Sequence, residues 1–126
     1  MQAQGAKKPD YIQATEHLEQ AVTGLRRAGR QDYLPCGLLA RTELRRAMKE
    51  YEKAQTDLDE AFSIATRGGM RLFEADCHLE YTRLYLAMGK KEQAREHWEK
   101  AKTMVSEIGY HRRDGELAAL EEKLSD

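Results

Sequence analysis

Small and apolar residues recur in this chain at a constant spacing of 40 residues, and no other feature constrains its fold as strongly. Four positions keep the spacing through three copies: Ala14, Ala54 and Ala94; Ala21, Ala61 and Ala101; Gly29, Gly69 and Gly109; and the large apolar residues Leu18, Leu58 and Trp98. A fixed period of this length predicts a stacked-repeat architecture, because each unit buries its apolar face only against its neighbours. Such folds usually bind other proteins and seldom catalyse reactions.

Helical spacing of the apolar residues predicts six helices joined by short turns. Asp10 is the expected N-cap of the first helix, and Pro35 falls in the first turn of the second, where its missing N–H is tolerated. No segment alternates apolar and polar residues as a strand would. The expected fold class is therefore all-α, an α-α superhelix or solenoid of about six antiparallel helices. The expected helices span about 10–28, 32–49, 51–67, 71–88, 91–108 and the residues after Asp114.

The 126 residues fit one domain, preceded by a flexible N-terminus at 1–9. Within the helical-repeat domain at 10–126, the register gives a half unit, two full repeats and a capping helix, at 10–29, 30–69, 70–109 and 110–126. A half unit has no partner for its apolar stripe. It indicates an excised piece or the far end of a longer array; alternatively, the first helix is an N-terminal cap or pairs with another copy of the chain.

Composition excludes several classes of function. Twenty-one basic residues oppose twenty-two acidic ones, and this near-neutral balance argues against general nucleic-acid binding. No apolar stretch approaches the roughly 20 residues that span a bilayer, and no signal peptide is evident, so we expect a cytoplasmic protein without membrane contact. Cys36 and Cys77 are expected to be reduced, partly buried thiols rather than a disulfide.

The later repeat resembles the tetratricopeptide pattern of a small residue, an aromatic, a turn glycine, and then alanine, a large apolar residue and alanine. It is met at Thr82, Tyr85, Gly89, Ala94, Trp98 and Ala101. In the earlier copy, Arg45 and Lys49 depart from the aromatic and the glycine. The period exceeds the family's usual length of about 34 residues. This longer form is similar to the C-terminal repeats of bacterial signalling ATPases and transcriptional regulators, and the resemblance covers about residues 10–125.

In that family the first helix of each pair lines a concave surface. The resemblance implies that this surface presents Cys36, Leu39, Glu43, Arg46 and Ala47 from one unit, and Asp76, Leu79, Arg83, Leu86 and Ala87 from the next. The expected binding mode desolvates Leu39, Leu79 and Leu86, while Arg46 and Arg83 hold a carboxylate through bidentate hydrogen bonds. The alternative is that these charges form an ordinary solvated face. The family's lysine and asparagine clamp for C-terminal peptides is not present.

Residues that could carry chemistry do not form a recognisable set. His17 and His97 share a repeat position on the outer helix face, and the side chains of Cys77 and His78 diverge on their helix. No histidine pair at i, i+4 and no Cys-x-x-Cys occurs, so no metal site and no cofactor is expected. Three basic clusters lie near helix ends and offer a surface for an acidic partner or RNA: Arg26-Arg27-Arg30, Arg45-Arg46-Lys49 and His111-Arg112-Arg113.

These patterns favour a non-enzymatic scaffold that binds a peptide or partner protein through the concave groove. The resemblance implies that it serves as the sensor arm of a larger bacterial signalling protein. The alternative hypothesis is a structural module that forms a homodimer through its terminal helix, at 10–28.

Overall fold

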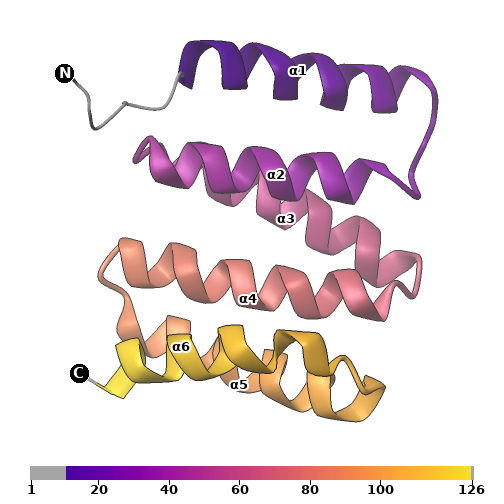
Figure 1. Ribbon diagram of the computed structural model, residues 1–126. Helices are drawn as coiled ribbons and strands as arrows, with labels where there is room; N and C mark the ends of the chain where they lie inside the picture. Colours follow the sequence, from indigo (N-terminus) through magenta and orange to yellow (C-terminus); the bar gives the residue numbers. More distant parts are fainter. Residues whose placement is uncertain (1–10, 126) are drawn as a thin grey trace, which may run out of the picture.

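The computed structural model describes residues 11–125, which form six α-helices and one short 3-10 helix (Figure 1). The helices are α1 (Tyr11–Arg27), α2 (Leu34–Ala47), α3 (Tyr51–Arg67), α4 (Arg71–Ala87), α5 (Lys91–Ile108), η1 (His111–Arg113) and α6 (Asp114–Ser125). The expected all-α class is confirmed for this part of the chain, and the predicted helix bounds hold to within about two residues from α2 to α5. The expected flexible segment 1–9 and the expected N-cap Asp10 lie outside the described residues.

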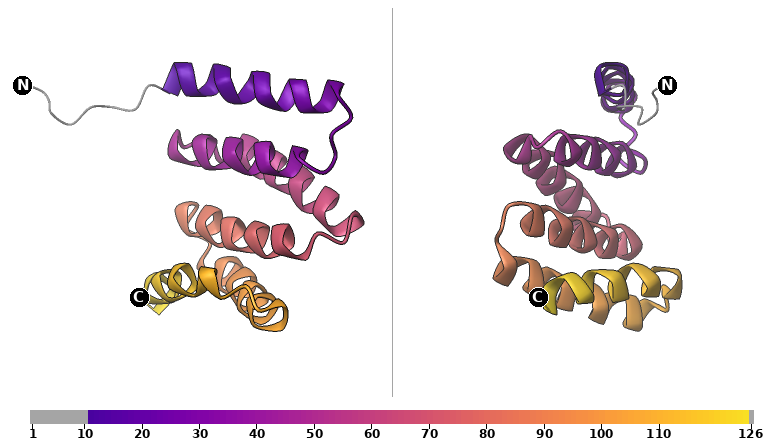
Figure 2. Two further views of the ribbon diagram at one scale, coloured as in Figure 1. Left: turned by 45° about the vertical axis from the view of Figure 1, so that its right-hand side comes forward. Right: turned by 60° about the vertical axis from the view of Figure 1, so that its left-hand side comes forward.

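Consecutive helices pack antiparallel, from α1 at one end of the molecule to α5 and α6 at the other (Figure 1). The backbones of α2 and α4 also approach each other, as do those of α4 and α6. Over the described residues, α1, α3 and α5 do not approach one another in this way. The two further views show the same order of helices from end to end (Figure 2). The helices α2, α4 and α6 therefore share one side of the molecule.

The turn between α2 and α3 is formed by a lysine where its counterpart has glycine. Lys49 adopts a left-handed backbone with φ of 63°, and Gly89, forty residues later, has φ of 76°. The next amide closes both turns in the same way, with Glu50 N bonded to Arg45 O and Lys90 N bonded to Tyr85 O, each at 2.8 Å. The departure of Lys49 from the repeat pattern therefore does not change the turn.

The repeated alanines of α3 and α5 are completely buried, as the pattern predicts. Ala54, Ala61, Ala94 and Ala101 are each 0% exposed. A small side chain at these positions lets a neighbouring helix approach closely. In α1 the corresponding Ala14 is half-buried and Ala21 is exposed.

The repeated large apolar position is also a core position. Leu58 is 0% exposed and belongs to a cluster shared by α1, α2, α3 and α4. Trp98 is 9% exposed and belongs to a second cluster shared by α4, α5 and α6. Its indole Nε1 donates a hydrogen bond to the carbonyl oxygen of Leu117 at 2.9 Å, which ties α5 to α6.

The two cysteines are free thiols in different environments. Cys77 is buried, and burial raises the pKa of its thiol to about 12. Cys36 is exposed, so the expectation that both thiols are partly buried is wrong for this residue. It lies in the first turn of α2 and faces the groove described next, which is open to solvent.

Candidate interaction groove

A groove of about 290 Å³ lies on the side of the molecule shared by α2, α4 and α6. Cys36, Leu39, Ala40 and Glu43 line it from α2; Phe73, Asp76, Leu79, Glu80 and Arg83 from α4; and Arg113 and Glu116 from η1 and α6. Residues from three segments far apart in the sequence thus meet in one depression. Its size suits one or two side chains of a partner rather than an enclosed small molecule.

Six of the eight residues predicted to bind a partner line this one groove. They are Cys36, Leu39, Glu43, Asp76, Leu79 and Arg83. Arg46 and Leu86 lie outside the lining, and Leu86 packs against the second core cluster. Ala47 and Ala87 are exposed and do not line the groove.

The apolar part of the groove differs from the sequence expectation. Leu79 is 1% exposed, so it is already buried and has almost no surface left to desolvate. It forms the groove floor, while the half-buried Leu39 and Phe73 supply apolar wall from α2 and α4. The apolar surface open to a ligand in this groove is therefore that of Leu39 and Phe73 rather than that of Leu79.

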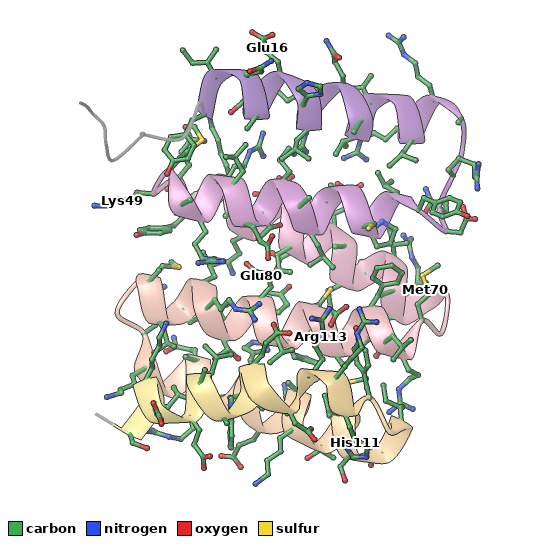
Figure 3. The ribbon with its side chains drawn as sticks, viewed as in Figure 1. Glu16, Lys49, Met70, Glu80, His111 and Arg113 are labelled. Carbon is green, nitrogen blue, oxygen red and sulfur yellow. The ribbon has the colours of Figure 1, made fainter. Side chains whose placement is uncertain are left out.

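A ladder of six alternating charges runs along this side of the molecule. Arg46 Nε lies 3.2 Å from Glu80 Oε2, and the opposite oxygen Oε1 of this buried carboxylate accepts a hydrogen bond from Arg83 at 2.9 Å. Arg83 continues to Glu116, which Arg113 meets at 2.5 Å. Arg113 Nε then bonds Asp76 at 2.9 Å. Figure 3 shows Glu80 between α2 and α4 and Arg113 beside α4.

The ladder favours the charged forms of Arg113 and Glu116. Burial opposes the charged form of both Arg113 and Glu116, but the hydrogen bonds between them, with those to Asp76 and from Arg83, outweigh it. The pKa of Arg113 is therefore raised and that of Glu116 is lowered. These pairs join α2, α4 and α6 on the groove side, and they hold the side chains in fixed positions.

Glu43 is the one lining carboxylate that forms no hydrogen bond or ion pair with any residue in 11–125. Burial raises the pKa of its carboxyl, and repulsion from Glu80 adds to this effect. Asp76, Glu80 and Glu116, in contrast, all have arginine partners. A cationic group placed at Glu43 would relieve the repulsion and stabilise the carboxylate.

The electrostatics therefore favour a cationic ligand group over an anionic one. Four carboxylates line the groove against the guanidinium groups of Arg83 and Arg113. Arg46 and Arg83, which were expected to hold a ligand carboxylate, already have acidic partners inside the chain. At Arg83, whose two terminal nitrogens already bond Glu80 and Glu116, a ligand carboxylate would compete with those partners, whereas a ligand cation meets Glu43 without displacing any group.

Sequence reasoning missed five lining residues, Ala40, Phe73, Glu80, Arg113 and Glu116. One of them was accessible from the repeat, because Glu116 stands forty residues after Asp76, which itself stands forty after Cys36. All three members of this register position line the groove. Arg113 was assigned to a basic cluster at a turn, and no local pattern indicates that it reaches Asp76.

A second polar cluster lies between α3, α4 and α5. His97 of α5 stacks on Tyr81 of α4, with ring centroids 4.5 Å apart, and its Nδ1 lies 3.0 Å from Nδ1 of His78. Phe62 of α3 packs edge-on against His78 at 5.1 Å. His17 and His97, which share a repeat position, thus have different surroundings, since His17 is exposed.

Among residues 11–125, no group of three histidine, cysteine or acidic side chains is arranged to hold a metal ion. No helix in the same range combines the length and apolar character needed to cross a membrane. Comparison with known proteins finds no family model, no curated protein and no solved structure that matches this chain.

Proposed function

We propose that this chain is a protein-interaction domain whose groove binds an extended or helical segment of a partner protein. The groove contributes apolar contact at Leu39 and Phe73 and a carboxylate at Glu43 for a lysine or arginine of the partner. The observation that carries the proposal is Glu43, an unpaired carboxylate on the wall of a groove in which the other carboxylates are held by arginines.

The proposal includes a tetratricopeptide-type superhelix, in which α2, α4 and α6 line the concave side. The 40-residue repeat supports it, as does the approach of α2 to α4 and of α4 to α6 without a similar approach between α3 and α5 in the described chain. The layer that would be concave is also the one that carries the groove.

Selection from a random peptide library tests the proposal without knowledge of the natural partner. We expect the wild-type chain to enrich peptides that combine a large apolar residue with lysine or arginine. A Glu43→Lys variant should reverse the charge preference and enrich acidic peptides, because only the charge at the groove wall has changed. Leu39→Asp should weaken the binding of the selected peptides by about 1–3 kcal/mol.

Glu16→Lys is the matched control, since it makes the same charge change on α1. Figure 3 shows Glu16 pointing away from the rest of the molecule. The proposal is wrong if the selected peptides bind the Glu43→Lys and Leu39→Asp variants as tightly as they bind the wild type. A library that yields no specific binder would also contradict it.

A further inference from the structure

The helix α1 leaves uncovered the face that α3 and α5 bury. Three repeated positions mark this face, and they are almost completely buried in both later copies. In α1 the same positions are Ala14 and Leu18, which are half-buried, and Ala21, which is exposed. Three residues after Ala21, a Cβ added to Gly24 would meet no atom within 4 Å, so the space beside Gly24 is also open. One end of the molecule is therefore an open helix face of small and apolar residues.

Contacts inside the chain identify what this face is built to meet. Asp57, on the corresponding face of α3, accepts hydrogen bonds from Arg41 at 2.7 and 2.8 Å and from Arg45 at 3.0 Å. Both arginines belong to α2, the helix that precedes α3. This face therefore packs against the preceding helix.

The next unit repeats the arrangement with different chemistry. His97 of α5 occupies the position of Asp57, and it stacks against Tyr81 and Tyr85 of α4 with centroids 4.5 and 5.5 Å away. The step from Arg41 to Asp57 and the step from Tyr81 to His97 are both sixteen residues long. Arg41 and Arg45 of α2 thus contact Asp57 of α3, and the residues at the equivalent positions in α4, Tyr81 and Tyr85, contact the equivalent His97 of α5.

The helix α6 presents the complementary open face. In the repeat register, Glu121 and Ser125 stand where Tyr81 and Tyr85 stand in α4, and Ala118 stands where His78 does. All three are exposed, because α6 turns its leucines toward the core. Hollows of about 330 and 150 Å³ border this face, and Glu121 lines both.

We propose that α6 of one copy packs against α1 of a second copy, head to tail, and so forms the helix pair that neither copy forms alone. Glu121 is equivalent in the repeat to Arg41 and Tyr81, and His17 is equivalent to their partners Asp57 and His97. When α1 of the second copy follows α6 as α5 follows α4, His17 therefore meets Glu121. The imidazole of that His17 donates an N–H to the carboxylate of Glu121, with Ser125 beside it. Because α1 and α6 lie at opposite ends of the molecule (Figure 2), the contact is between two different surfaces.

This inference does not depend on the groove, and it differs from a symmetric dimer through the first helix. In a symmetric dimer, α1 of one copy would pack against α1 of the other, and α6 would not contribute to the interface. In the head-to-tail arrangement every added copy leaves one free α1 face and one free α6 face. The association therefore continues to longer assemblies as concentration rises.

Light scattering on the full chain tests the proposal. We expect the mean mass of the wild type to rise above the 14.5 kDa of one chain as concentration increases. Ala21→Arg blocks the α1 face, and Ala118→Arg blocks the α6 face. Both residues are exposed, so both variants should fold, which circular dichroism checks. Each variant alone should have the mass of one chain.

A mixture of the two variants is the decisive sample. The Ala21→Arg copy keeps an intact α6 face and the Ala118→Arg copy keeps an intact α1 face, so the mixture should form a one-to-one dimer with about twice the mass. A mixture that remains monomeric overturns the proposal, as does a wild type that is monomeric at every concentration. A mass that falls with Ala21→Arg but not with Ala118→Arg would assign a symmetric dimer instead.

Charge exchange tests the predicted pair directly. Glu121→Lys and His17→Glu should each raise the dissociation constant about tenfold, because one places two basic groups together and the other two acidic groups. In a mixture of the two variants, junctions between unlike copies bring Lys and Glu together in one orientation and restore the original pair in the other. We expect the mixture to associate almost as tightly as the wild type, and a mixture no tighter than its components would contradict the pairing.

Discussion

The Nδ1 atoms of His78 and His97 lie 3.0 Å apart, between α4 and α5. At this distance one ring donates its N–H and the other accepts, so the accepting ring must be neutral. Burial, followed by the charge of His97, lowers the pKa of His78 to about 4. Burial also lowers the pKa of His97. The cluster is therefore built for uncharged imidazoles.

This arrangement predicts a loss of stability in mild acid. The unfolded chain binds a proton at His78 near pH 6.5, whereas the folded chain binds it only near pH 4. The stabilisation is thus complete above pH 6.5 and is lost as pH falls toward 4, with a total of about 3 kcal/mol. Urea denaturation between about pH 7.5 and 5.5, above the range of ordinary carboxylates, should show a loss of about 1 kcal/mol.

Two variants separate this effect from general titration. His78→Phe removes the titrating ring from the buried site, so its free energy of unfolding should depend less on pH. His17→Gln, on the exposed face of α1, should follow the wild-type profile when unfolding is measured at a low protein concentration, where the chain does not associate. An unchanged pH dependence in His78→Phe would show that the buried pair does not control acid stability.

The left-handed turn at Lys49 gives a prediction of opposite sign. A side chain with φ of 63° is strained by contact between its Cβ and the backbone, and glycine has no Cβ. Lys49→Gly should therefore stabilise the chain by about 0.5–1 kcal/mol. This is the net value once the greater entropy of glycine in the unfolded state has been subtracted from the relief of strain. Equilibrium unfolding in urea measures the change.

The repeat supplies the reciprocal control for this turn. Gly89, forty residues later, has φ of 76°, and Gly89→Lys should destabilise the chain by about 1 kcal/mol. If both substitutions changed stability in the same direction, backbone strain would not be the cause.

Helices, turns and the buried alanines were predictable because their causes are local. Helical spacing places Ala54, Leu58 and Ala61 on one stripe, and such a stripe must be buried wherever a neighbour exists. The same reasoning fails for Ala21, which shares the pattern and is exposed. Its exposure depends on which helices are present around α1. The repeat register indicates this, because it leaves the half unit at 10–29 without a partner for its apolar stripe, whereas the spacing within one helix does not.

Most of the charge ladder was not predictable, because three of its five contacts are long-range and depend on side-chain reach, while the other two are local i,i+3 pairs. Arg46 and Glu80 are 34 residues apart, and Arg113 lies 37 residues from Asp76. Arginine has a long flexible side chain, so a register position alone does not say whether it points at a ligand or at a neighbouring carboxylate. This is why the sequence interpretation assigned Arg46 and Arg83 to a partner, while both are paired inside the chain.

Glu80 should be the most sensitive member of the ladder. Its carboxylate is 3% exposed, and it accepts from both Arg46 and Arg83. Glu80→Gln removes the charge but keeps the shape, so we expect a loss of about 1.5–3 kcal/mol in the free energy of unfolding. Glu107→Gln is the matched control, because Glu107 pairs with Arg71 at an exposed site. The control should change stability by less than about 0.5 kcal/mol, and equal effects would contradict the importance of burial.

The equivalent alanines of α1 and α3 offer the sharpest test of how the repeat packs. Ala61 is 0% exposed, so the three extra carbon atoms of Ala61→Leu have no space and should cost about 1–3 kcal/mol. Ala21 is exposed, and Ala21→Leu should change the free energy of unfolding by less than about 0.5 kcal/mol. Denaturation at low protein concentration measures the single chain. Equal costs at the two positions would mean that α1 is covered in the isolated chain, and that its open face does not exist.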